Sequence, residues 1–236
     1  MKKLIFSLLV FLTLSINAQD FESVKFMGIP VNGTKENMIS QLEQKGFKYD
    51  AKSDYLDGKF NGEDAIIYVG TNKDVVDRIM VTYINPISET DIKIKFNRLV
   101  RQFENNEKYF SLLEDQSIDD DVDISYDISI KKKRFQASYH QCYTKAEIDA
   151  LKTLINDNYE TFMDNFAKSS ELKESGLSFD GTREENINAI AALMGMAYMM
   201  KNDVWFMISE SKTMYNHYMI TMFYDNLSNR PNGEDL

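Results

Sequence analysis

Two residues with reactive side chains, His140 and Cys142, lie two positions apart in an expected strand, so their side chains share one face. A cysteine beside a histidine can supply a nucleophile and its general base, and both residue types bind zinc. Along one strand this spacing is too long for a direct hydrogen bond, and zinc needs more ligands, whereas His217 is the only other imidazole. We therefore expect ordinary strand residues here, and we assign no catalytic residue, metal ligand or cofactor.

Four aspartates form a second group of possible chemical interest: Asp119, Asp120, Asp121 and Asp123. Calcium binds several oxygen ligands at alternating positions of a loop. This segment lacks the glycine and the distal glutamate of an EF-hand loop. The pattern is typical of a solvated loop, and an opportunistic cation contact is the alternative.

Aromatic residues gather around the last two expected strands, 204–209 and 218–224. Alternation makes both faces of the second strand apolar, with Met222 on one face and Phe223 on the other. Either helices cover both faces, or one face is a docking site for a partner. The candidate binding residues are Trp205, Phe206, Tyr218 and Phe223.

Eight of the thirteen methionines lie between Met194 and Met222. Methionine fills irregular cores, and it also lines adaptable binding surfaces. Four of these methionines ring an expected helix that is apolar on most sides, which favours deep burial. A groove for a peptide or ligand is the main alternative, and copper chemistry is a further one.

Motifs that identify common enzyme classes are absent from the sequence. It contains no glycine-rich phosphate loop, no serine nucleophile elbow, no HExxH segment and no paired zinc ligands. On this basis an enzyme is less favoured than a binding protein. Two carboxylates brought together by folding would still suffice for hydrolysis.

The N-terminus has the pattern of a cleavable signal peptide over residues 1–18. Lys2 and Lys3 precede an apolar run, 4–16, that is too short to span a bilayer stably, and Ala18 suits a signal peptidase. The only cysteine, Cys142, is far from the cut, so there is no lipobox and no internal disulfide. We expect a periplasmic or secreted protein with no stable membrane insertion after cleavage.

The chain is acidic, with 27 Lys and Arg residues against 37 Asp and Glu residues and a net charge of −10. Removal of the signal, which carries Lys2 and Lys3 and no acid, takes this charge to −12. Phosphate recognition needs clustered basic side chains, so we expect no nucleic-acid partner. Another envelope protein or a peptide is the expected partner.

Capping and turn residues predict the elements of the first part of the chain. A helix begins after Thr34 and ends at Gly46. Three strands follow, the first two joined by an Asn-Gly turn: 55–60, 65–69 and 75–83. A second helix begins near Ser88, where apolar residues recur at helical spacing: Ile92, Phe96, Leu99, Val100 and Phe103.

The second part of the chain combines alternating segments with two capping boxes. Alternation predicts strands over 124–130 and 135–139. Capping boxes at Thr144 and Thr182 begin two long helices. The complete pattern predicts an α+β fold in which an antiparallel sheet is flanked by helices.

Segments 28–36 and 176–184 match at a constant offset. In each, an apolar residue precedes an Asx-Gly turn that leads into a Thr-capped helix. The match suggests an internal repeat and two related α+β halves, 19–143 and 144–236, which can also form one continuous domain. Chance similarity between two helix entrances is the alternative.

Three parts of the sequence resemble a family of uncharacterised secreted or periplasmic proteins of Gram-negative gut anaerobes: Phe26–Thr34, Arg98–Asn105, and Phe223–Asn226 with Asn232–Leu236. The family has no assigned activity, so the resemblance implies no catalytic residues. The order of a helix followed by antiparallel strands is similar to the β-lactamase-inhibitor-protein-like fold and to small outer-membrane-assembly lipoproteins, although the latter carry a lipobox. Such folds host unrelated functions.

These observations lead us to expect a non-catalytic binding module for a protein or peptide. An envelope assembly or stress factor is one alternative, and it should co-fractionate with the outer membrane. A hydrolase that uses fold-assembled carboxylates is the other, and it should have a deep pocket with two acids of strongly perturbed pKa.

Overall fold

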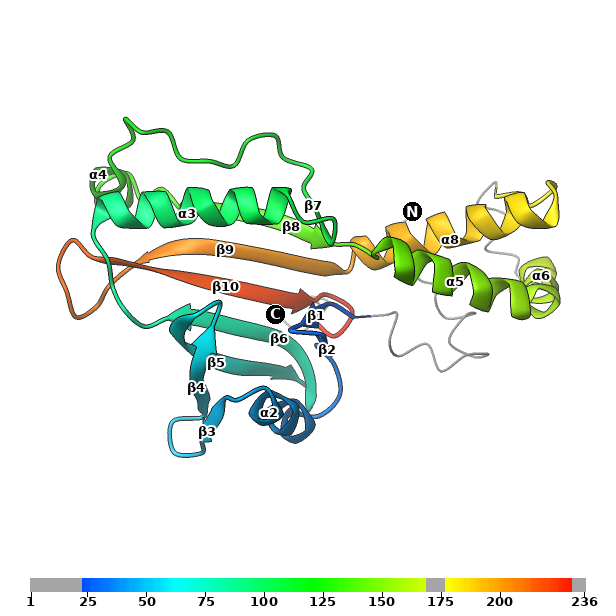
Figure 1. Ribbon diagram of the computed structural model, residues 1–236, viewed down its shortest axis with the longest axis horizontal. Helices are drawn as coiled ribbons and strands as arrows, with labels where there is room; N and C mark the ends of the chain where they lie inside the picture. Colours follow the sequence, from blue (N-terminus) through cyan, green and yellow to red (C-terminus); the bar gives the residue numbers. More distant parts are fainter. Residues whose placement is uncertain (1–22, 169–176, 231–236) are drawn as a thin grey trace. The chain divides into compact units, whose positions relative to one another are not determined.

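A computed structural model of the chain describes residues 23–168 and 177–230 (Figure 1). These residues form two compact units. The sheet unit contains residues 23–141 and those from 201 onward, and the helical unit lies between residues 142 and 200. The expected α+β class is confirmed, because an antiparallel sheet is flanked by helices. The predicted signal peptide lies outside the described residues.

An eight-stranded antiparallel sheet is the main element of the sheet unit. A separate hairpin consists of β1 (Lys25–Phe26) and β2 (Ile29–Pro30). Three helices accompany the strands: α2 (Lys35–Gln44), α3 (Glu89–Glu104) and α4 (Ile124–Ser129). The strands of the large sheet are, in sheet order, β3 (Lys48–Asp50), β4 (Tyr55–Phe60), β5 (Glu63–Asn72), β6 (Val75–Tyr83), β10 (Tyr218–Asn226), β9 (Asn202–Glu210), β8 (Gln136–Gln141) and β7 (Tyr109–Phe110).

The large sheet consists of two four-stranded meanders that meet in its middle. Strands β3 to β6 form one meander and β7 to β10 form the other, and the last strands of the two, β6 and β10, pair antiparallel. Helices α2 and α3 precede the first strands of the two meanders. In chain order, the boundary between the two meanders of the sheet lies after β6. The sequence suggested a boundary between two halves at residue 143, which lies near the start of the helical unit.

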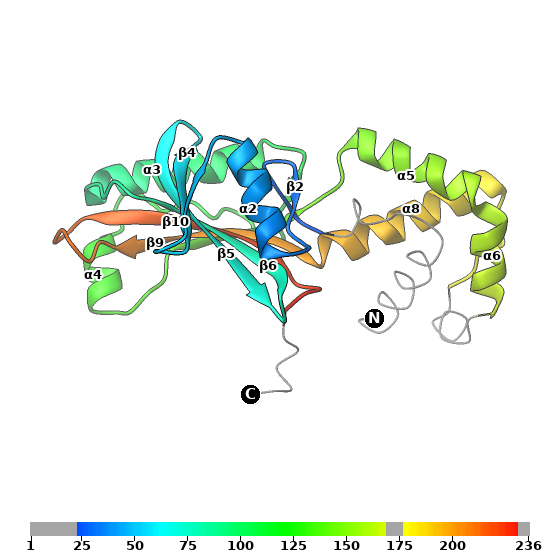
Figure 2. The same cartoon turned by 90° about the horizontal axis from the view of Figure 1, so that it is seen from below.

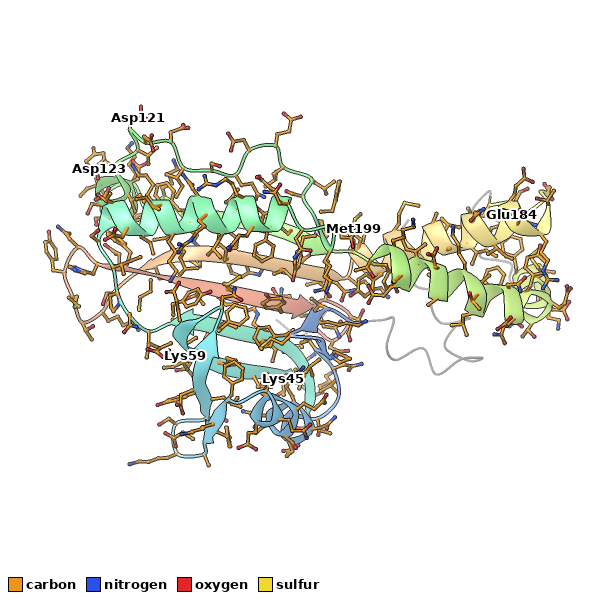
Figure 3. The ribbon with its side chains drawn as sticks, viewed as in Figure 1. Lys45, Lys59, Asp121, Asp123, Glu184 and Met199 are labelled. Atoms are coloured by element: carbon orange, nitrogen blue, oxygen red, sulfur yellow. The ribbon has the colours of Figure 1, made fainter. Side chains whose placement is uncertain are left out.

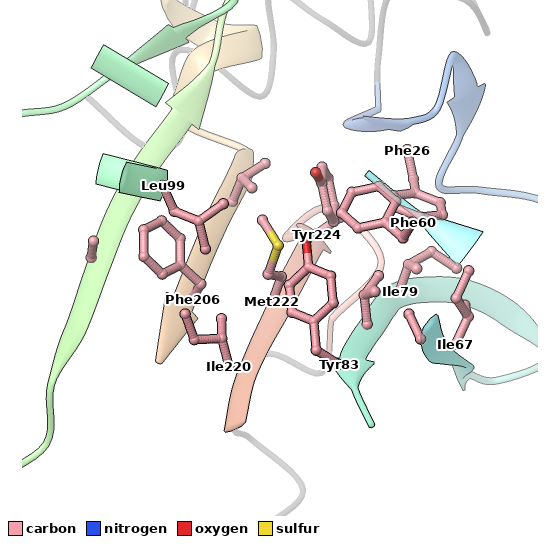
Figure 4. Close-up of a cluster of buried hydrophobic side chains, with 14 of the residues drawn as sticks. Phe26, Phe60, Ile67, Ile79, Tyr83, Leu99, Phe206, Ile220, Met222 and Tyr224 are labelled. Atoms are coloured by element: carbon pink, nitrogen blue, oxygen red, sulfur yellow. The ribbon is translucent and has the colours of Figure 1, made fainter. Parts of the chain in front are cut away.

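Helices α2 and α3 and the small hairpin cover one face of the large sheet. Phe96 of α3 packs on Phe206 of β9 with ring centroids 5.0 Å apart, and Phe26 of β1 packs on Tyr224 of β10 at 4.9 Å. Met38 of α2 is buried in the same core. Figure 4 shows that side chains from both meanders fill this core. We call this side of the sheet the covered face.

Local cap and turn signals lie where the sequence predicts them, and the expected helices and strands from residue 34 to residue 104 are confirmed. Thr34 and Ser88 each accept a hydrogen bond from the backbone N–H three residues later, at the starts of α2 and α3. Asn61 and Gly62, between β4 and β5, have φ angles of 50° and 82°. Two consecutive positive φ angles are typical of the type I′ turn that favours Asn-Gly.

One expected strand is wrong: residues 124–129 form α4. The carboxylate of Asp123 accepts a hydrogen bond at 2.7 Å from the backbone N–H of Tyr126 and so caps this helix. Ile124 and Ile128, four residues apart, pack on the core, while Tyr126 is 50% exposed. A segment this short fits a period of two and a helical period almost equally well, and the capping aspartate favours the helix.

The helical unit contains α5 (Lys145–Asp157), α6 (Tyr159–Lys168) and α8 (Arg183–Met199). Helices α5 and α8 lie side by side, and α6 turns away after the C-terminal end of α5 (Figures 1 and 2). The expected capping boxes at Thr144 and Thr182 are both present. Of the clustered methionines, Met194 is buried in the core of this unit, whereas Met196 is 50% exposed.

The threonines of the suggested repeat, Thr34 and Thr182, have the same capping role. The turns before them differ, because Gly33 has a φ of 75° and Gly181 does not adopt a positive φ. Residue 176, the first of the second segment, lies outside the described residues. The internal repeat therefore stays a prediction.

The free energy of unfolding at alkaline pH tests the burial of Tyr83, a residue of β6 in the covered core. Burial raises the pKa of the Tyr83 phenol to about 12. Because the unfolded-state value is lower, at about 10, this residue contributes stability below pH 10 that is lost as the pH rises through 12. We expect Tyr83→Phe to lose less unfolding free energy than the wild type on going from about pH 9 to about pH 12, by roughly 1–3 kcal/mol. Urea titrations at the two pH values measure this, and Tyr215→Phe, at a 91% exposed position, is the control. Equal alkaline losses in all three proteins would contradict the prediction.

Candidate functional site

No helix of the sheet unit, among the residues that the structure describes, covers the second face of the large sheet. Along β5, β6 and β9, side chains of this face alternate with those of the covered face, and most are partly exposed. We call it the open face. Its apolar members are Ile66 and Tyr68 of β5, Met80 of β6, Trp205 and Met207 of β9, and Met219 and Phe223 of β10.

A stack of three side chains from adjacent strands lies in the middle of the open face. Trp205 of β9 and Phe223 of β10 are opposite each other in the register, and their rings stack with centroids 3.9 Å apart and planes 13° apart. The guanidinium carbon of Arg78 in β6 lies 4.9 Å from the Phe223 ring centroid. It is 5.8 Å from the ring of Trp205. We call these three residues the Trp205 stack.

Asp225, which is only 1% exposed, holds the Trp205 stack in place. Its carboxylate accepts hydrogen bonds from Nε and Nη2 of Arg78, at 2.6 and 3.0 Å, and from Nε1 of Trp205 at 2.7 Å. Nη2 of Arg230 lies 2.6 Å from the same carboxylate. Burial raises the pKa of Asp225, and the bonds from Arg78 and Trp205 oppose that shift. Both oxygens are already engaged, so this carboxylate positions its neighbours and is not available to a substrate.

His140 and Cys142 do not form a reactive pair in this structure. Nδ1 of His140 in β8 lies 2.7 Å from Oδ1 of Asp203, its cross-strand neighbour in β9. Cys142 follows the end of β8, and burial raises the pKa of its thiol. A raised pKa lowers the thiolate fraction, and the thiolate is the nucleophile.

The structure divides the four candidate binding residues between the two faces of the sheet. Trp205 and Phe223 lie together on the open face, in direct contact. Phe206 and Tyr218 lie on the covered face and are 0% and 1% exposed, so a partner of the folded protein cannot reach them. Sequence reasoning missed Arg78, because its place beside Phe223 depends on the pairing of two strands that are far apart in the chain.

The pockets within the described residues include one in the helical unit and two in the sheet unit. One of about 420 Å³ near Gln116 includes Asp115, whose pKa is lowered by a hydrogen bond from the backbone N–H of Ser117. One of about 440 Å³ lies between Glu89 and Asp120. The third, of about 540 Å³, belongs to the helical unit and has no acidic lining residue. The carboxyl groups with a raised pKa, those of Asp77 and Asp225, line none of the three.

The acidic segment 119–123 forms a loop beside α4, and Figure 3 shows Asp121 and Asp123 there. The ammonium group of Lys93 holds this loop by donating to the backbone oxygens of Asp120 and Val122, both at 2.7 Å. Within the described ranges, no three His, Cys, Asp or Glu side chains are grouped so that they could hold a metal ion. Within the same residues, no helix has the length and apolar character needed to cross a membrane.

No protein-family model matches the chain, and neither a curated protein nor a solved structure is significantly similar to it. The family resemblance suggested by the sequence stays a prediction, as does the likeness to the β-lactamase-inhibitor-protein-like fold.

Removal of the Asp225 carboxylate tests its role beneath the Trp205 stack. We expect Asp225→Ala to lower the free energy of unfolding by about 2–4 kcal/mol, because it leaves the charge of Arg78 without its buried partner. The emission of Trp205, the only tryptophan, should also shift as its indole N–H loses its acceptor. Urea unfolding and fluorescence measure the two effects. Asp57→Ala, at an exposed position in β4, is the control, and an equal loss of stability in both variants would contradict the role of Asp225.

Proposed function

We propose that this protein is a non-catalytic binding module that recognises a partner protein or peptide through the open face of its sheet. The observation that carries the proposal is the one-sided covering of that sheet. The described helices and the small hairpin of the sheet unit lie on the covered face, while aromatic and methionine side chains remain partly exposed on the other. Exposed apolar patches of this kind mark interaction sites.

The residue types on the open face favour a protein partner. Tryptophan, tyrosine and arginine are enriched among the side chains that dominate binding energy at protein interfaces. Trp205 and Arg78 lie at the centre of the open face, with Tyr68, which is 36% exposed, on β5. Met80 is the cross-strand neighbour of Phe223, and Met207 follows Trp205 by two residues on β9. Methionine adapts its shape to a partner at little cost.

The Trp205 stack is also preorganised for binding. A side chain that is immobilised on association costs free energy, and a side chain that is already held does not. Asp225 fixes both Arg78 and Trp205 through hydrogen bonds of 2.6 to 3.0 Å. A partner would therefore meet these groups in their binding geometry.

The sheet edges are poor alternatives to the open face. An extended peptide can add to an exposed edge strand, where it forms main-chain hydrogen bonds. The two edge strands here are β3, with three residues, and β7, with two. Short edge strands limit such pairing, so the face of the sheet is the better candidate.

The N-terminal sequence supports a periplasmic or secreted location for this binding function. A basic start, a short apolar run and Ala18 match a cleavable signal. The net charge of −10 disfavours partners with phosphate backbones and agrees with a protein partner.

Site-specific photo-crosslinking tests the proposed surface. A photoreactive phenylalanine analogue replaces Met207 on the open face or, as a control, Ile94 on α3, which is 58% exposed. After irradiation in the native envelope, mass spectrometry identifies the products. We expect one dominant partner from position 207 and none from position 94. Equal products from both positions, or none from position 207 when crosslinking is shown to work, would overturn the proposal.

Substitution of the stacked rings should abolish capture of that partner. Trp205→Ala and Phe223→Ala each remove a large contact area, and loss of such residues weakens binding by about 2 kcal/mol or more, at least roughly thirtyfold. Melting temperatures show whether each variant still folds. Because Phe223 is only 9% exposed, Met207→Glu provides a second variant that leaves the stack intact. Ile94→Ala is the matched control, and full capture by Trp205→Ala and Met207→Glu would exclude this surface.

A further inference from the structure

The pocket of the helical unit is a candidate binding site independent of the open face. It has a volume of about 540 Å³, within the range of about 300–1,000 Å³ that is typical of small-ligand sites. Residues of α5 and α8 form its walls, together with Cys142 and Tyr143 just before α5. Its apolar lining includes Ile148 of α5 and Ala192, Gly195, Met196 and Met199 of α8.

Small residues on α8 leave the space that the pocket occupies. Ala192 is exposed, and Gly195 has no side chain to fill the gap beside α5. A Cβ atom at Gly195 would come no closer than 3.9 Å to Tyr143, an ordinary contact distance. A Cβ atom at position 195 therefore meets no clash, and a larger side chain there would take up part of the pocket.

One charged side chain, Lys152 of α5, lines this apolar pocket. Among the residues that the structure describes, Lys152 has no ion-pair partner. Asn188 of α8 is the other polar side chain of the lining. An apolar cavity with a single unpaired cation complements a ligand that has one anionic group and one hydrocarbon part.

We propose that the helical unit binds a single-chain anionic amphiphile, with its hydrocarbon chain between α5 and α8 and its carboxylate at Lys152. The flexible Met196 and Met199 adapt to the chain, as methionine does at adaptable binding surfaces. An amphipathic peptide helix is less favoured, because such a helix uses anchors spread over two or more turns of a groove, whereas this pocket has the volume of a small-ligand site. The inference does not depend on the open face.

Calorimetric titration of the protein without its signal peptide tests how binding depends on the length of the ligand's hydrocarbon chain and on the charge of its head group. The probes are octanoate, decanoate and dodecanoate below their micelle concentrations, with 1-decanol and decyltrimethylammonium as neutral and cationic analogues. We expect affinity to rise by about fourfold for each added methylene until the pocket is full. Decanoate should bind about tenfold more tightly than 1-decanol, because the carboxylate pairs with Lys152. Decyltrimethylammonium should bind least.

Two variants locate the site. Gly195→Leu places a side chain in the pocket between α5 and α8 and should abolish decanoate binding, whereas Ala189→Leu, at an exposed position of the same helix outside the lining, should not. Lys152→Met should remove the preference for decanoate over 1-decanol, and Lys145→Met, in the first turn of α5, should keep it. Circular dichroism and melting temperatures confirm that each variant folds.

The thiol of Cys142 supplies an independent readout, because it lines the same pocket and is the only cysteine. Saturating decanoate should slow its alkylation by iodoacetamide in the wild type and leave the rate unchanged in Gly195→Leu. The proposal is overturned if none of the amphiphiles binds, which would leave the pocket to a protein segment. It is also overturned if decyltrimethylammonium binds as well as decanoate, or if Gly195→Leu retains full affinity.

Discussion

The pairing of β6 with β10 is the constraint on which the rest of the sheet unit depends. It joins two meanders that lie far apart in the chain, and its register places Thr82 opposite Thr221 and Arg78 opposite Asp225. On the open face, a 3.2 Å contact between the two hydroxyl groups holds the threonine pair. Hydrogen bonds from the Arg78 guanidinium to the Asp225 carboxylate hold the other pair. If β10 slipped by one residue along β6, each side chain of β10 would move to the opposite face of the sheet. The carboxylate of Asp225 would then enter the hydrophobic core.

The buried charge of Asp225 is tolerated because the end of the chain completes its surroundings. Arg230 reaches the same carboxylate from the turn that follows β10. That turn is held by the side chain of Asn229, which donates to the backbone oxygen of Val76 at 2.8 Å. Asn226 similarly donates to the backbone oxygen of Val31 at 2.9 Å. The charge cluster, the last strand and the segment after β2 are thus stabilised together, and the Trp205 stack takes its rigidity from them.

Local features of this fold could be predicted from the sequence, and non-local ones could not. The cap at Thr34 and the turn at Asn61-Gly62 depend on neighbouring residues alone, and both predictions are confirmed. Alternation does not predict helix α4, because six residues do not separate the two periods and only the cap at Asp123 favours the helix. The gathering of aromatic residues in the last two strands identified Trp205 and Phe223 as binding candidates. It could not distinguish them from Phe206, because only the position of α3 shows which face is covered.

The helical unit is inserted in the chain between two neighbouring strands of the sheet, so the two proposed sites belong to separate parts of the fold. Strands β8 and β9 are antiparallel neighbours that need only a short hairpin, with His140 opposite Asp203 at its end. The described part of this connection instead contains helices α5, α6 and α8. Lengthening a connection costs little free energy when its two ends are already adjacent, so the sheet tolerates the insertion. A pocket formed by the inserted unit alone can therefore vary in its lining residues without disturbing the register on which the open face depends.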